Sequence, residues 1–110
     1  MPYTVDNILS DPLLTVEDRH DEMGSFALRI GSLQTVVFIE LGRFRSTQDT
    51  KSTVSHAIHT PMQAAPYRTS RPFDDDWAYA LHRAVDGLLS YYRAAVAAGH
   101  LPEEAWLVKN

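Results

Sequence analysis

Apolar and polar residues alternate through the middle of the chain, and this pattern predicts β-strands. Residues 26–30 carry large apolar side chains at every second position, as in a strand with one buried face. An apolar run rich in β-branched and aromatic residues follows over 33–41, and alternation returns over 53–59. We therefore predict an antiparallel meander of three strands within residues 25–59, with Gly31-Ser32 as the turn of its first hairpin.

The last third of the chain has a different period, which predicts one long helix. Apolar residues recur there every three or four positions, as on the buried face of a helix. Asp74-Asp75-Asp76 supplies acids suited to a helix start, and Gly99 is a typical stop. We predict a helix over residues 74–98, followed by a turn over 99–110 that returns Trp106 to the core.

The first 24 residues contain two shorter helix signals. Thr4 is a suitable cap for a first turn. Thr15 followed by Asp18 resembles a capping box, and Gly24 is a suitable stop. We therefore predict two short helices in this segment.

Together these elements predict a single domain of the α+β class: a three-stranded antiparallel β-meander packed against one long C-terminal α-helix, with short N-terminal helices. The chain has 110 residues, 45% apolar and 22% charged, as expected for one globular domain. Its predicted segments are an acidic N-terminal helical segment (1–24), the β-meander (25–59), a Pro-rich loop (60–73), the long helix (74–98) and a C-terminal turn (99–110).

The residue types argue against most enzyme chemistry. The chain has no cysteine, which excludes disulfides and thiol catalysis, and it has no phosphate loop or nucleophile elbow. Ser55 and His56 are neighbours on a predicted strand, where adjacent side chains point to opposite faces, so we do not expect a nucleophile–base pair. We predict no enzyme, no catalytic residue and no cofactor.

A metal site is also not predicted. Asp75, His82 and Asp86 share one face of the predicted helix by their spacing. That face also carries arginines and a serine, which is typical of a solvated surface, and no metal-binding motif supports the cluster.

Charge is segregated along the chain although the net charge is only −4. Residues 23–72 are basic and lie between two acidic flanks, which indicates either an anionic partner or a solvated surface that balances those flanks. The first interpretation includes a nucleic-acid-binding module that contacts phosphates through Arg43, Arg45, Arg68 and Arg71.

The loop before the long helix is the favoured recognition element. Tyrosine and arginine are enriched at binding hot spots, and prolines lower the cost of ordering a loop. In the alternative interpretation Tyr67 pins the loop to the core and the arginines pair with nearby acids. The predicted partner-binding residues are Tyr67, Arg68, Ser70 and Arg71 of the loop, with Arg43 and Arg45.

A second stripe on the long helix consists of small residues and one tyrosine, at Ala80, Ala84, Gly87, Tyr91 and Ala94. Such a stripe lets another backbone approach closely and predicts self-association as a homodimer. Alternatively, the alanines only supply helix propensity.

These features predict a non-enzymatic protein that binds another protein, as an inhibitor, adaptor or regulator, for example a mobile-element anti-defence inhibitor. We expect it in the cytoplasm and away from membranes, because no apolar run approaches the ~20 residues that span a bilayer. The alternatives are the nucleic-acid-binding module and a small enzyme or ligand-binding subunit, with a pocket between sheet and loop that uses His56 or Tyr67.

Overall fold

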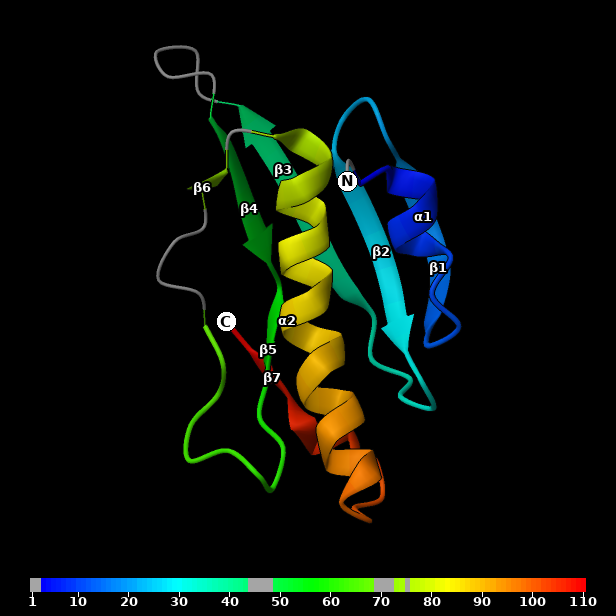
Figure 1. Cartoon of the computed structure of the whole chain (residues 1–110), viewed down its shortest axis with the longest axis vertical. Coiled ribbons are helices and arrows are strands. Elements are labelled where there is room, and N and C mark those ends of the chain that lie inside the picture. The colour runs from blue at the N-terminus through cyan, green and yellow to red at the C-terminus, as the bar shows by residue number, and fades with distance from the viewer. Residues whose placement is uncertain (1–2, 44–48, 69–72, 75) are drawn as a thin grey trace.

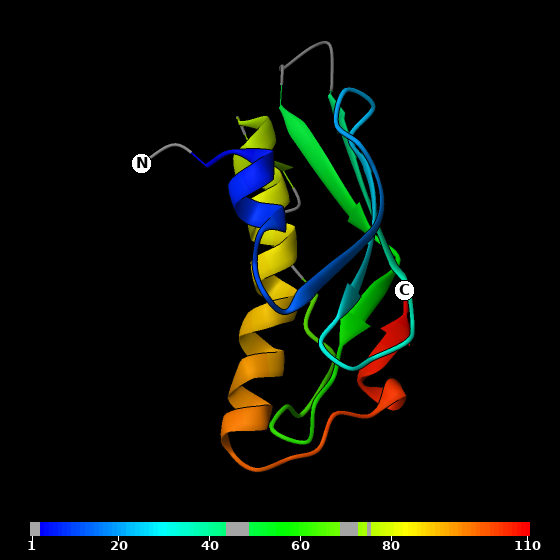
Figure 2. The same ribbon diagram turned by 90° about the vertical axis from the view of Figure 1, so that its right-hand side faces the viewer.

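The computed structural model describes residues 3–43, 49–68, 73–74 and 76–110, and in these residues the chain forms two layers. One layer is an antiparallel sheet, and the other consists of two helices on one of its faces (Figures 1 and 2). Among the described residues, no helix covers the opposite face of the sheet. The predicted α+β class, with an antiparallel sheet and one long C-terminal helix, is confirmed.

The sheet is a meander of four strands extended by a short fifth one, in the order β1-β2-β3-β4-β6. A separate sheet of two strands pairs β5 with β7. The elements are α1 (Val5–Leu9), β1 (Leu14–His20), β2 (Ser25–Ile30), β3 (Val37–Arg43), β4 (Thr50–Val54), β5 (His56–Ile58), β6 (Phe73–Asp74), α2 (Trp77–Ala97), the 3-10 helix η1 (Glu104–Trp106) and β7 (Leu107–Lys109).

The N-terminal prediction is correct for its first helix and wrong for its second. Thr4 caps α1, because its side chain accepts a hydrogen bond from the Asn7 N–H. The predicted second helix is strand β1, so the meander is not three-stranded. The residues that resemble a capping box also fit the alternation of a strand. Leu14 and Val16 of β1 pack against the core, and Leu14 lies opposite Ile30 of β2. Pairing along a whole strand outweighs a local helix signal of this kind.

Two predicted strand boundaries are also wrong. The connection from β2 to β3 is longer than a two-residue hairpin. Leu33 lies in this connection, outside the strand pairing, and its side chain is buried in the core. Gly31 nevertheless adopts the positive φ expected of it, at 53°. The predicted strand 53–59 divides at Ser55, where the chain bends out of the main sheet and continues as β5.

The long helix is close to its prediction at both ends. Asp76 is its N-cap, accepting a hydrogen bond from the Tyr79 N–H at 2.8 Å, while Asp74 belongs to β6. The helix ends just before Gly99, whose φ is 94°. None of the described helices has the length and apolar character needed to cross a membrane.

The core lies between α2 and the inner face of the sheet. The inward side chains of β2 and β3 are at most 5% exposed, and Trp106 returns to this core as predicted, at 3%. Large apolar side chains contribute about 1.5–3 kcal/mol each when fully buried. The layer consists mainly of Phe26, Leu28, Ile30, Val37, Ile39 and Leu41 from the sheet, and Leu81, Val85, Leu88, Leu89 and Tyr92 from α2.

Candidate functional site

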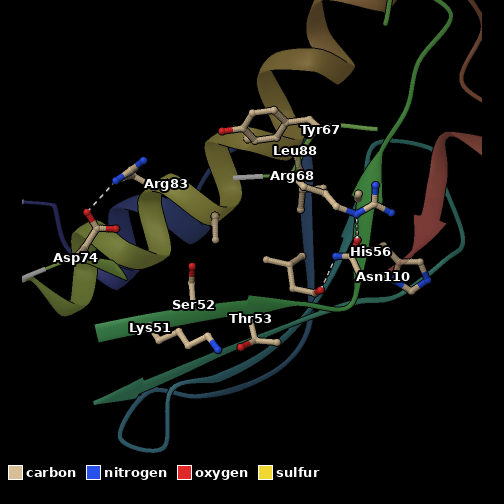
Figure 3. Close-up of a pocket in the computed structure, with 14 residues that line it drawn as sticks. Lys51, Ser52, Thr53, His56, Tyr67, Arg68, Asp74, Arg83, Leu88 and Asn110 are labelled. Carbon is tan, nitrogen blue, oxygen red and sulfur yellow. Dashed lines mark hydrogen bonds and ion pairs between the residues drawn. The ribbon is translucent and has the colours of Figure 1, made fainter. Parts of the chain in front are cut away.

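A cavity of about 310 Å³ opens between α2 and the edge of the sheet, where β4 gives way to β5. Figure 3 shows its side chains: Arg83 and Leu88 come from the helix, and Ser52 points from β4 toward them. Tyr67 and Arg68 enter from the loop that follows β5. The cavity therefore joins the sheet, the helix and the predicted recognition loop.

Small residues on α2 make room for the cavity and for Tyr67. Ala84 and Gly87 both line the cavity, and the Tyr67 ring lies against Gly87 so closely that a Cβ there would be 2.8 Å from Cε2. The Tyr67 N–H donates to Ile58 O at 2.9 Å, which holds the loop in place, and its ring lies 5.0 Å from that of Tyr91. Tyr67 thus forms a wall of the cavity.

Arg68 is held at the other side of the cavity through Asn110. The Arg68 Nε donates to Asn110 Oδ1 at 3.0 Å, and Asn110 Nδ2 donates to Val54 O at 2.7 Å. The backbone N–H of Asn110 donates to Ser55 O at 3.0 Å. The arginine is therefore tied, through one amide side chain, to the backbone of β4.

Arg83 is the second cation of the lining. Its Nη1 donates to Asp74 Oδ1 at 3.0 Å, and the Asp74 side chain is only 10% exposed. This hydrogen bond and the charge of Asp74 raise the pKa of Arg83. A partly buried ion pair thus closes the end of the cavity next to β6, with Arg83 still 38% exposed.

Ser55 and His56 contact each other, contrary to the sequence prediction. Ser55 Oγ lies 2.7 Å from His56 Nδ1, because the chain bends at Ser55 and the two side chains no longer alternate across one strand. The Phe38 N–H donates to the same Oγ at 2.8 Å. Only His56 lines the cavity, so the pair presents no nucleophile to it.

His56 gives the fold a specific sensitivity to acid. Burial, with a smaller effect of the Lys109 charge, lowers the pKa of His56 below its usual 6.5. The unfolded chain therefore binds a proton more readily at this position, and the free energy of unfolding falls as the pH drops through about 6.5.

We expect His56→Gln to show a smaller loss of stability between pH 7 and pH 5 than the unmodified chain. Urea titrations at several pH values measure the two slopes. Identical slopes would show that His56 does not contribute to the acid sensitivity of the fold.

The structure brings together only part of the predicted partner-binding set. Tyr67 and Arg68 line the cavity, whereas Arg43 lies at the end of β3 with its guanidinium 5.3 Å from the centre of the Trp77 ring and does not line it. Arg43 and Arg68 therefore do not line the same cavity. The remaining residues, Arg45, Ser70 and Arg71, lie outside the described residues.

The predicted self-association stripe does not form one continuous exposed surface. Ala80 is completely buried in the core, so it is not available to a second copy. Ala84 and Gly87 line the cavity, and Tyr91 packs against the loop through Tyr67. Only Ala94 is exposed. Self-association stays a prediction, and its surface would need residues beyond this stripe.

Of the three residues that helix spacing places on one face as possible metal ligands, the structure describes His82 and Asp86. His82 stacks on Tyr3, with ring centroids 3.9 Å apart, and Asp75 lies outside the described residues. No group of three potential ligands occurs in the part of the chain that the structure describes.

Comparison with protein-family models, curated proteins and solved structures finds no significant match. The geometry of the chain itself is therefore the basis for a functional proposal.

Three residues that hold the polar contacts of the cavity, Arg83, Asp74 and Asn110, carry no sequence signal for a binding site. Arg83 sits on a helix face with other charges, which is typical of a solvated surface, and Asp74 belongs to the acidic run that predicts the helix start. Asn110 carries no motif. Their roles depend on contacts between segments far apart in the chain, such as that of Arg68 with Asn110, 42 positions later.

Proposed function

We propose that this protein is a non-enzymatic interaction module that binds a partner protein at the cavity between β4, β5 and α2. The observation that carries the proposal is the position of Tyr67 and Arg68, which both line this cavity. Binding hot spots are enriched in aromatic residues and arginine, and they cluster at well-packed pockets.

The size of the cavity suits an anchor from a partner rather than a large cofactor. Its volume of about 310 Å³ is at the lower end of the range of ligand pockets, about 300–1,000 Å³. Such a volume accommodates one or two side chains, and protein interfaces commonly place a few anchor side chains in pockets of this kind.

Photo-crosslinking tests the proposal. Tyr67→p-benzoylphenylalanine places a reactive group at the cavity, and the same substitution at Tyr3 is a matched control, because the two tyrosines are 38% and 40% exposed. The variants are irradiated in lysate of the source cells after nuclease treatment, and adducts are identified by mass spectrometry. We expect a protein adduct at position 67 that is absent at position 3.

Two outcomes would contradict this proposal. Equal adducts at both positions would indicate non-specific contact, and an adduct that appears only without nuclease would favour the nucleic-acid-binding alternative.

A small-molecule-binding subunit is a second candidate, favoured by one observation. Both residues expected to serve such a pocket, His56 and Tyr67, line the same cavity. A bound metabolite would be released on denaturing the purified protein and detected by mass spectrometry. Ala84→Leu fills part of the cavity and would reduce the amount recovered, whereas Ala94→Leu, on the exposed end of α2, would leave it unchanged.

A further inference from the structure

We propose that the cavity binds a carboxylate, the side chain of an aspartate or glutamate of the partner protein, on the guanidinium group of Arg68. Asn110 is the positioning residue that holds this guanidinium. The inference rests on the proposed function, because it takes the carboxylate to belong to a protein.

The hydrogen bonds of Asn110 determine how Arg68 is presented. An amide nitrogen donates and an amide oxygen accepts. Because Nδ2 donates to Val54 O at 2.7 Å, Oδ1 is left to accept from the Arg68 Nε at 3.0 Å. The amide thus has one orientation that satisfies both partners, and it fixes the guanidinium through its Nε.

Among the described residues, nothing engages the outer part of the guanidinium. In the described part of the chain, the two terminal amino groups of Arg68 have no hydrogen-bond partner. Two parallel N–H groups on a fixed plane match the two oxygens of a carboxylate, and such bonds are among the stronger hydrogen bonds in proteins.

The charge of the lining favours an anion although the whole chain carries −4. Arg68 and Arg83 contribute two positive charges among the described lining residues. The Lys51 side chain extends on the opposite side of β4 from Ser52 (Figure 3), so its charge acts from outside the cavity. Asp74 is the only carboxylate side chain among the described lining residues, and Arg83 already engages it. Burial lowers the pKa of His56, so its ring is mainly neutral near pH 7.

The rest of the lining favours a carboxylate on an aliphatic stem over inorganic phosphate. Val54, Ala57, Ala84 and Leu88 supply apolar surface. Methylene groups of an aspartate or glutamate side chain can cover this surface. A phosphate ion would instead place polar oxygens against it, with too few donors to satisfy them.

Titrations with two small probes test the chemistry directly. N-acetyl-glutamate N-methylamide carries the carboxylate on a neutral backbone, and N-acetyl-glutamine N-methylamide is its uncharged isostere. Binding is followed by NMR in the side-chain signals of Asn110 and in the Nε–H signal of Arg68. We expect saturable shifts with the glutamate probe, and at least about ten-fold weaker binding of the glutamine probe and of inorganic phosphate.

Variants distinguish three contributions to binding: the paired N–H groups of Arg68, their positioning by Asn110, and positive charge alone. We expect Arg68→Gln to weaken binding of the glutamate probe by about ten-fold or more. Arg68→Lys is expected to weaken binding less, because lysine keeps the positive charge but lacks the paired N–H groups of the guanidinium. Asn110→Asp introduces a competing carboxylate and has the same expected effect as Arg68→Gln. Lys109→Gln also removes one positive charge but lies outside the lining, and is expected to retain binding within about two-fold.

The outcomes distinguish this inference from the proposed function. Equal binding of the glutamate and glutamine probes, preference for phosphate, or no binding of the glutamate probe would each overturn the carboxylate site. The Tyr67 crosslink would still report whether a protein occupies the cavity. Specific binding of the glutamate probe without a Tyr67 protein adduct would overturn the assignment of the carboxylate to a protein, in favour of a free small acid.

Discussion

Phe26→Ala is expected to reduce the free energy of unfolding by about 3–5 kcal/mol, as large-to-small changes of buried aromatic residues do. The Phe26 side chain is 1% exposed and lies opposite Ile39 in the pairing of β2 with β3. Removing its ring leaves a cavity in the layer between sheet and helix. Because domains of this size are stable by only about 5–15 kcal/mol, a large part of the stability would be lost.

Urea denaturation measures this loss, and Phe38→Ala is the matched control. Phe38 lies on the adjacent strand but on the opposite face of the sheet, where it is 54% exposed. Its replacement is expected to cost less than about 1 kcal/mol, as is common for surface positions. Equal losses for the two variants would mean that the outer face is covered as well as the inner one.

Gly31→Ala is expected to destabilise the fold by about 2–4 kcal/mol, from an unfavourable backbone conformation and a steric clash. The φ of Gly31 is 53°, and a Cβ there would be 2.0 Å from the Tyr92 hydroxyl oxygen and 2.5 Å from Cζ. The Tyr92 ring is 4% exposed and packs edge-on against Trp106 at 5.8 Å, so it has little room to move.

Gly99→Ala separates the cost of the backbone conformation from the cost of the steric clash. Gly99 also has a positive φ, of 94°, but a Cβ there would meet nothing within 4 Å. We expect this control to cost about 1–2 kcal/mol, the backbone contribution alone. If thermal or urea unfolding showed equal losses for both variants, the contact between Gly31 and Tyr92 would not contribute to stability.

The elements predicted well are those specified by nearby residues. The long helix has a regular apolar stripe, an N-cap at Asp76 and a stop at Gly99, all close together in the chain. The alternation in β2 likewise predicts which side chains enter the core, and Phe26 and Leu28 are both 1% exposed. Helix caps and side-chain periods are local properties, so one sequence is enough to detect them.

The elements predicted wrongly are those in which a distant segment supplies the stabilising contacts. Residues 14–20 become a strand because β2 pairs with six of these seven residues, with a bulge at Glu17, which a capping-box pattern does not reveal. The bend at Ser55 depends on β7, just over fifty residues later in the chain, which takes β5 as its partner. Strand pairing is non-local, so the pattern of a single segment does not determine it.

The same distinction holds for the candidate site. By itself, the sequence determined the class of the fold, its long helix, and the residue types that made Tyr67 and Arg68 recognition candidates. Only the tertiary structure decided that these two residues line one cavity with Arg83, that Asn110 holds Arg68, and that Arg43 lies against Trp77 outside this lining. The physical reason is that a binding site requires precise distances between side chains from separate segments, and these distances are established only when the sheet and the helix pack together.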